Sequence, residues 1–349
     1  MVSECLKNHY FCDMSNINIR ALAKELGLSV GTVSKALRDS HEISAGTKKK
    51  VQDLARKLNY VPNPYASSLR RRKSKTIAVV LPEVANSFFS LAIDGIEAVA
   101  QEKGYHVLIY LTHENLLKEE AILQDFQSGR VDGVLLSVSG QTTGIDHIRD
   151  LFAKDMPIVF FDRVCEDVET TKVITDDFES AYKATQFLIE KGCNHIGFLC
   201  ISPGLSITIK RMQGYKKALS DHQRAVDPSD IIICPDDPDK NYTTIRNALE
   251  QEDRFDGIIA AIEKLSITTY LVCKELRLSI PGDVKVVGFS NLSSAAILNP
   301  SLTTITQPAF EMGKAAASAL FKALKKDSSM PANECIVIPS TLIVRDSTG

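Results

Sequence analysis

Apolar residues follow one spacing in the first 75 positions of the chain and another spacing beyond them. The early spacing, every three or four residues, is that of amphipathic helices. It predicts helices over Ile19–Leu26, Val30–Leu37 and Ser44–Leu58. Gly27 ends the first helix, and Ser29 stands at the N-cap of the second. Helix, short turn with glycine and second helix form the helix-turn-helix pattern, so an all-α head with this motif is expected.

Beyond Lys75, short apolar runs alternate with amphipathic segments. Such alternation indicates parallel sheets covered by helices on both faces. It occurs in two successive sets, so an α/β body of two doubly wound, parallel-sheet lobes is expected. The expected strands are 76–81, 106–111, 133–137, 158–161, 173–175, 195–200, 231–234, 257–261 and 285–289, and the expected helices are 90–103, 119–128, 145–154, 179–191, 213–220, 243–251 and 267–275.

The length of 349 residues also favours more than one domain. We expect an N-terminal extension over 1–16, a helix-turn-helix domain over 17–63, a linker over 64–75 and the α/β body over 76–349. The first lobe is assigned about 76–174 plus 306–330, and the second about 175–305 plus 331–349. Translation from Met1 and translation from Met14 both fit the sequence.

Charge is divided between the two parts. Residues 1–75 hold 15 Lys and Arg against 6 Asp and Glu, a formal +9, and the remaining residues hold 26 against 37, a formal −11. A basic head on an acidic body indicates that the head binds a polyanion. In a helix-turn-helix the second helix enters the major groove, so Val30, Gly31, Ser34 and Lys35 are expected to face base edges. Ser29 and Thr32 are expected to cap that helix or to bind phosphate.

Several other classes of protein are not indicated. No apolar run approaches the roughly 18 residues of a membrane span, and Met1–Ser15 lacks the features of a secretion signal, so a cytoplasmic protein is expected. The eight cysteines form no C-x-x-C pair and the seven histidines no H-x-x-x-H pair, so no metal site is expected. Phosphate-loop, dinucleotide-binding and nucleophile-elbow motifs are absent, which argues against an enzyme or a bound cofactor.

The head and linker together carry a family resemblance. Ala21-Leu22-Ala23, Thr32-Val33-Ser34-Lys35-Ala36-Leu37, Leu58-Asn59-Tyr60-Val61-Pro62-Asn63 and the pair Ala66 and Leu69 resemble the lactose-repressor (LacI/GalR) family of bacterial transcription regulators. The resemblance implies that Pro64–Arg70 is a hinge helix in the minor groove of an operator, with Leu69 as an apolar wedge and Arg70 beside it. It also implies DNA contacts from His41, Asn63 and Ala66.

The same resemblance implies that the body resembles a periplasmic binding protein, serves for effector binding and dimerisation, and holds a small effector between its lobes. Asn86-Ser87-Phe88-Phe89 stands where the family often has Asn-Pro-Phe-Phe, and its two aromatic rings are the expected stacking platform for the ligand. The chain departs from the family pattern at two places. Ile262-Glu263 stands where the family commonly has Asn-Asp, and Gly288-Phe289-Ser290-Asn291 stands where it commonly has Gly-Phe-Asp-Asp. These departures affect the expected ligand more than the fold. The effector contacts implied are Phe88, Phe89, Asp162, Arg163, Asp177, Arg211, Glu263, Ser290 and Asn291. For Arg211, the alternative is a structural ion pair with an acidic neighbour such as Asp162 or Asp177.

The sequence therefore predicts a ligand-controlled, sequence-specific DNA-binding regulator, a repressor of carbohydrate-use genes. The expected partners are a palindromic double-stranded operator, a second copy of the chain, and a sugar or sugar derivative as effector. A nucleobase or an organic acid is the alternative effector. A solute-binding protein without gene control, and an RNA or nucleoid binder without an effector, are the alternative functions.

Overall fold

The computed structural model describes residues 18–60, 74–251, 253–325 and 333–349. The chain divides into two compact units, Met1–Arg71 and Arg72–Gly349, close to the expected boundary between head and body. Within the described ranges, no helix is long and apolar enough to cross a membrane.

The head consists of helices that each begin at a polar cap residue. Side-chain oxygens of Asn18, Ser29 and Ser44 accept backbone N–H groups from the first turns, which otherwise lack partners. Gly27 ends the first helix with φ 64, a left-handed conformation that glycine adopts without strain. The three predicted helices are confirmed as α1 (Ile19–Leu26), α2 (Val30–Leu37) and α3 (Ala45–Lys57).

A small apolar core holds these helices together. Leu22 of α1, Val33 and Ala36 of α2, and Val51 of α3 are completely buried in one cluster. Each lies on the apolar face that the helical spacing predicts. The core therefore fixes which face of α2 remains exposed.

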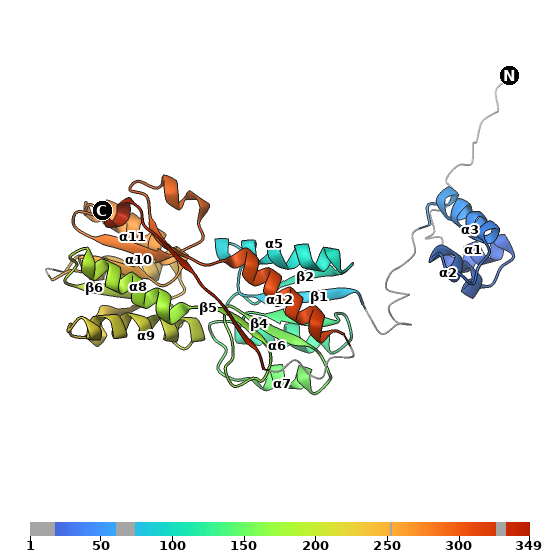
Figure 1. Ribbon diagram of the computed structural model, residues 1–349, viewed down its shortest axis with the longest axis horizontal. Helices are drawn as coiled ribbons and strands as arrows, with labels where there is room; N and C mark the ends of the chain where they lie inside the picture. The colour runs from blue at the N-terminus through green and yellow to red at the C-terminus, as the bar shows by residue number, and fades with distance from the viewer. Residues whose placement is uncertain (1–17, 61–73, 252, 326–332) are drawn as a thin grey trace, which may run out of the picture. The chain divides into compact units, whose positions relative to one another are not determined.

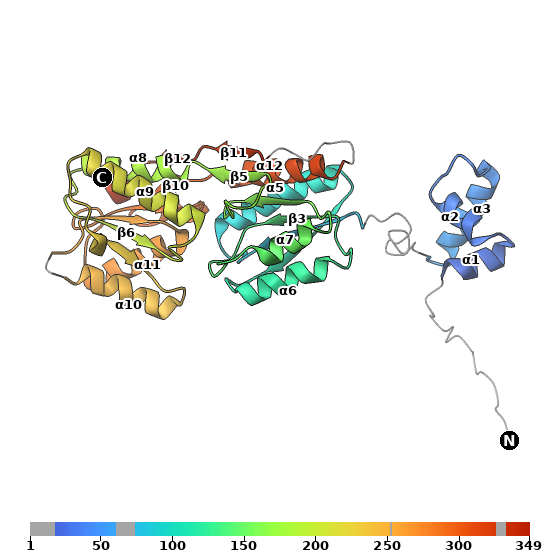
Figure 2. The ribbon, with the colours of Figure 1, turned by 90° about the horizontal axis from the view of Figure 1, so that it is seen from below.

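The first lobe of the body is built on a six-stranded parallel sheet with the order β11-β5-β4-β3-β1-β2. Helices α5 and α12 cover one face and α6 and α7 the other (Figures 1 and 2). The elements are β1 (Thr76–Leu81), α5 (Ser87–Glu102), β2 (His106–Leu111), α6 (Leu116–Phe126), β3 (Gly133–Leu136), α7 (Asp146–Phe152), β4 (Ile158–Phe161), β5 (Lys172–Thr175), α12 (Ala309–Ala323) and β11 (Cys335–Ile338).

The second lobe has the sheet order β12-β10-β9-β8-β6-β7. It is parallel except for β12, which pairs antiparallel with β10. Helices α8 and α9 cover one face, and α10 and α11 the other (Figure 2). The elements are α8 (Asp177–Glu190), β6 (Ile196–Cys200), α9 (Ser206–Asp221), η1 (Pro228–Asp230), β7 (Ile231–Ile233), α10 (Pro238–Leu249), β8 (Gly257–Ala260), α11 (Glu263–Leu276), β9 (Lys285–Phe289), η2 (Ser293–Ile297), β10 (Thr303–Thr306), β12 (Thr341–Ile343) and η3 (Asp346–Thr348).

The chain passes between the lobes three times, after β5, after β10 and after β11 (Figure 1). Hydrogen bonds join these passages: Ser340 N donates to Asp176 Oδ1 at 2.7 Å, and Gln307 Nε2 donates to Thr175 Oγ1 at 3.3 Å. Assigning all of 331–349 to the second lobe is wrong. Strand β11 pairs with β5, so this part of the segment belongs to the first lobe.

Candidate functional site

The exposed face of α2 is the candidate DNA-binding surface of the head. Val30, Gly31 and Lys35 are exposed, and Ser34 is half-buried. Because Val33 and Ala36 occupy the core, these positions face away from it. The structure thus places the four residues predicted to face base edges on the open side of the helix.

Ser29 and Thr32 form the cap of α2. The Thr32 backbone N–H donates to Ser29 Oγ at 3.0 Å, and the two hydroxyl oxygens lie 2.9 Å apart. Of the two roles expected for these residues, capping is the one that the structure shows.

Two basic side chains near α2 have acidic partners within the head. Lys35 forms an ion pair with Glu42, and Lys48 Nζ lies 2.7 Å from Asp39 Oδ1. The Lys35–Glu42 pair is exposed on both sides, and exposed ion pairs are weak, so a phosphate oxygen can replace the Glu42 carboxylate. His41 is exposed in the turn between α2 and α3. The other predicted contacts, Asn63, Ala66, Leu69 and Arg70, lie outside the described residues.

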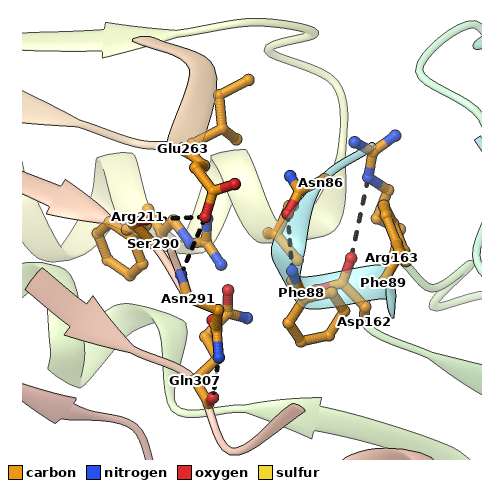
Figure 3. A pocket seen from close by; sticks show the side chains of 13 residues that line it. Asn86, Phe88, Phe89, Asp162, Arg163, Arg211, Glu263, Ser290, Asn291 and Gln307 are labelled. Atoms are coloured by element: carbon orange, nitrogen blue, oxygen red, sulfur yellow. Dashed lines mark hydrogen bonds and ion pairs between the residues drawn. The ribbon is translucent and has the colours of Figure 1, made fainter. Parts of the chain in front are cut away.

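In the body, a pocket lies between the two lobes, beyond the carboxyl ends of β1, β4, β8, β9 and β10 (Figure 3). The free volume between its side chains is about 20 Å³, roughly the space of one water molecule. Parallel strands of both lobes end here, which is where α/β sheets bind ligands. The lining residues are Asn86, Phe88, Phe89, Asp162, Arg163, Ile207, Arg211, Ile262, Glu263, Phe289, Ser290, Asn291 and Gln307.

Arg211, on α9, is held almost completely buried. Its Nε donates to Asp177 Oδ1 at 2.7 Å, Nη1 donates to the Ala261 carbonyl, and the guanidinium lies 4.0 Å from the centre of the Phe289 ring. The remaining nitrogen, Nη2, is buried and has no hydrogen-bond partner among the described residues. A buried guanidinium N–H without an acceptor is costly, so this group is suited to an oxygen atom of a ligand.

Arg163 has a similar arrangement on the facing lobe. Its Nη1 donates to both carboxylate oxygens of Glu114, each at 2.8 Å. Its Nε is buried without a hydrogen-bond acceptor in the described part of the chain, although Asp162 Oδ2 lies 3.9 Å away. The guanidinium also lies 5.8 Å from the centre of the Phe89 ring. Each lobe thus contributes one guanidinium with a buried N–H that lacks a hydrogen-bond acceptor among the described residues.

Two carboxyl groups of this region have perturbed pKa values. Burial raises the pKa of Asp162 to about 6, although the positive charges of Arg163 and Arg211 act in the opposite direction. Burial also raises the pKa of Asp177, against the stabilising charge and hydrogen bond of Arg211. In both residues, desolvation outweighs the neighbouring guanidinium groups.

The comparisons with known proteins match both parts of the chain. Residues 18–63 match the model of the bacterial regulatory proteins of the lacI family, and residues 185–348 match a periplasmic binding protein-like domain. The HTH-type transcriptional regulator RegA of Clostridium saccharobutylicum is 30% identical over 333 residues, which cover 95% of this chain and 99% of that protein. The chain belongs to the lacI family of bacterial regulatory proteins.

A second relative is similar in sequence, and a solved structure shares the fold. The ribose operon repressor of Haemophilus influenzae is 28% identical over 329 residues, 94% of this chain and 98% of its own length. The crystal structure of the lac repressor dimer bound to operator and the anti-inducer ONPF superposes with a TM-score of 0.82 at 20% identity, covering 96% of this chain and 99% of that one. The family and fold predicted from the sequence are confirmed. The protein is therefore a DNA-binding transcription regulator controlled by an effector.

This lacI-family body brings together most of the predicted effector residues. Eight of the nine line the pocket. The exception, Asp177, does not line it but lies behind Arg211 as its ion-pair partner. Asn86, Ile207, Ile262, Phe289 and Gln307 also line the pocket and were not among the predicted contacts. Gln307 directly follows β10. Because ligands of α/β sheets bind beyond the carboxyl ends of the strands, Gln307 is a candidate contact once that strand is known.

Proposed function

We propose that this lacI-family regulator is a cytoplasmic, non-catalytic repressor of carbohydrate-use genes. Its head binds a palindromic operator as part of a homodimer, and its body binds a neutral sugar between the lobes. The pairing of donors and acceptors in the pocket supports this proposal more directly than any other observation.

The unsatisfied polar atoms of the pocket are of both kinds. Arg163 Nε and Arg211 Nη2 are donors, and Asn291 Oδ1 is a buried acceptor without a partner among the described residues. A hydroxyl group both donates and accepts, so a ligand with several hydroxyl groups suits unsatisfied atoms of both kinds. A ligand that only accepts leaves Asn291 Oδ1 without a donor.

The charges favour a neutral ligand. Asp162 and Glu263 line the pocket, and Asp177 and Glu114 hold its two arginines from behind. Four carboxyl groups thus surround two guanidinium groups, an excess of negative charge that disfavours a buried anion. We infer that a neutral sugar binds in preference to a sugar acid or another organic acid.

The relatives support the remaining parts of the proposal. One relative is named as the repressor of a ribose operon, and ribose is a sugar. The lac repressor in the structure described above is a dimer bound to its operator. A two-fold dimer presents two heads to two half-sites, so a palindrome is the expected operator. The exposed face of α2 is the part of each head proposed to contact the bases.

The test uses the full-length protein in two steps. Selection from random duplex DNA is expected to yield a site with two symmetric half-sites. A thermal-shift screen of neutral sugars, sugar acids and nucleobases is then expected to show stabilisation by neutral sugars. The sugar that stabilises is added to the protein–operator complex, and a change in operator affinity is expected. Stabilisation by nucleobases or sugar acids alone, or equal affinity for every duplex, contradicts the proposal.

A further inference from the structure

One side chain in the pocket bonds to both lobes of the body. Glu263, the first residue of α11 in the second lobe, accepts through Oε1 from Ser87 of the first lobe, from its Oγ at 2.9 Å and its backbone N–H at 3.2 Å. Through Oε2 it accepts from groups of its own lobe, Ser290 Oγ at 2.8 Å and the Asn291 backbone N–H at 3.1 Å. A carboxylate accepts about four hydrogen bonds, so Glu263 is fully occupied.

The backbone explains why a carboxylate is stable at this point. Ser87 is the first residue of α5, as Glu263 is of α11, so the carboxylate lies at the N-termini of two helices. The N-terminal N–H groups of helices lack intrahelical partners and carry partial positive charge. The Ser87 N–H is such a group, and Glu263 satisfies it from the opposite lobe.

The pocket must change before a sugar enters. Its free volume of about 20 Å³ holds a water molecule, and a sugar ring has many more atoms. Separation of the two lobes would affect the hydrogen bonds of Oε1 and those of Oε2 differently. Ser290 and Asn291 belong to the same lobe as Glu263, whereas Ser87 belongs to the facing lobe. Separation of the lobes therefore releases the Ser87 bonds and retains the other two.

We propose that Glu263 is the specificity-determining acceptor of this pocket, and that hydroxyl groups of the sugar replace the Ser87 donors on Oε1. The inference rests on the proposed function and specifies how its ligand is selected. Ser87 and the sugar compete for the same oxygen. Glu263 itself stays oriented by Ser290 and Asn291 in both states. A ligand without hydroxyl donors leaves a half-buried carboxylate oxygen unpaired, which is unfavourable.

The two sides of the contact give opposite expectations. Ser87→Ala removes a competing donor, and we expect sugar affinity to rise about two- to ten-fold, the scale of one hydrogen bond. Glu263→Gln places an amide N–H₂ where an acceptor is needed, and we expect sugar affinity to fall about ten-fold or more. The matched control is Glu166→Gln. Glu166 also bonds across the lobes, to Lys210 Nζ at 2.7 Å, but it is exposed and does not line the pocket.

The experiment measures two quantities on the full-length chain. Calorimetry with the neutral sugar that stabilises the parent protein gives affinities for the parent and the three variants. Hydrogen–deuterium exchange at the start of α5, without added sugar, reports the contact itself. Faster exchange is expected in Glu263→Gln and parent-like exchange in Glu166→Gln. The affinity of Glu166→Gln is expected to equal that of the parent.

The outcomes separate the two proposals. Opposite shifts for Ser87→Ala and Glu263→Gln support the inference. If the parent binds the sugar and both variants shift in the same direction or not at all, the inference is overturned and the proposed function stands. If no neutral sugar binds the parent, the proposed function fails, and with it the assigned ligand of Glu263. If hydrogen–deuterium exchange at the start of α5 is unchanged in Glu263→Gln, the proposed hydrogen bonding of Glu263 to Ser87 across the lobes is wrong, whichever ligand binds.

Discussion

Asp162 combines a buried carboxyl group with an unusual backbone conformation. It follows β4 with φ 61, in the left-handed region, and its side chain is almost completely buried in the pocket wall. Only a few side chains, asparagine and aspartate foremost among them, adopt this region readily. The position therefore tolerates Asn in its backbone, and Asp162→Asn tests the charge alone.

The raised pKa of Asp162 predicts a pH-dependent effect of Asp162→Asn. Because its pKa is about 6 in the folded protein against an ordinary 3.8, the folded state binds this proton more tightly than the unfolded state does. The contribution of Asp162 to stability thus falls as pH rises from about 4 to about 6 and stays low above that range. At neutral pH, we expect Asp162→Asn to raise the free energy of unfolding of the body by about 2–3 kcal/mol.

The measurement is denaturant unfolding of the parent and of Asp162→Asn at several pH values. The difference between the two proteins is expected to shrink toward zero near pH 4, where the parent carboxyl is protonated like the neutral amide. A difference that is constant with pH, or that has the opposite sign at neutral pH, contradicts the raised pKa of Asp162.

At the scale of single residues, the sequence predicts which residues lie at the pocket better than it predicts what each of them does there. Asp177 and Arg211 both follow from the family resemblance as effector contacts, yet Asp177 serves as the buried partner of Arg211. Ser87 is not among the predicted contacts, and its hydrogen bond with Glu263 joins residues 176 positions apart. No local pattern specifies such a pair, because it depends on how the two lobes close.

Two elements of the head offer a matched pair of caps. Helices α2 and α3 begin with the same Ser-x-x-Thr arrangement: Ser29 Oγ accepts from Thr32 N at 3.0 Å, and Ser44 Oγ accepts from Thr47 N at 3.3 Å. We expect Ser29→Ala and Ser44→Ala each to lower the free energy of unfolding of the head by about 1 kcal/mol. Only Ser29 begins the helix proposed to enter the major groove, so Ser29→Ala is expected to lose more operator affinity.

Unfolding and operator-binding measurements on the two variants separate stability from contact. Equal losses of operator affinity in Ser29→Ala and Ser44→Ala would show that Ser29 acts only as a cap, and would remove it from the proposed DNA contacts.

In the body, helices α5 and α12 touch through glycines. A Cβ atom on Gly313 would overlap the carbonyl group of Ala92, and one on Gly95 would overlap that of Phe310. We expect Gly313→Ala to force the helices apart and to lower the free energy of unfolding of the body by about 1–3 kcal/mol. The control is Gly46→Ala on α3, where no atom lies within 4 Å of the added Cβ.

Gly46→Ala is expected to stabilise the head by up to about 1 kcal/mol, because alanine is the better helix former. Unfolding curves of both variants against the parent give the two values. A Gly313→Ala variant as stable as the parent would show that α5 and α12 can move apart without loss of packing.

Element boundaries show where apolar spacing stops being informative. It predicts helices from 90, 213 and 267, whereas α5, α9 and α11 begin at Ser87, Ser206 and Glu263. The first turns of these helices contain pocket residues such as Phe88, whose positions follow the ligand site rather than an apolar stripe. The spacing also predicts no helix over Ala309–Ala323, where α12 lies. The nine expected strands agree with β1 to β9 to within one residue at each end, whereas no strand is expected over Thr303–Thr306, where β10 lies.

At the scale of the whole molecule, operator and effector binding belong to separate parts of one chain. The head carries a formal +9 over residues 1–75 and the body a formal −11, so DNA is attracted to one part and repelled by the other. The pocket lies between two lobes joined by three chain passages. A ligand bound in this pocket therefore contacts both lobes of the body.

Coupling of the two sites predicts a reciprocal effect. If the sugar changes the operator dissociation constant by a given factor, bound operator must change the sugar dissociation constant by the same factor, because the four states form a closed thermodynamic cycle. We expect this factor to lie between about 5 and 150, the range for coupling energies of about 1–3 kcal/mol. Calorimetry of sugar binding with and without operator, and operator titrations with and without sugar, give the two factors independently. A duplex with the half-sites scrambled serves as the control and should leave sugar affinity unchanged. A sugar that binds the body with the same affinity in the presence and absence of operator would contradict its role as the effector, even though it occupies the pocket.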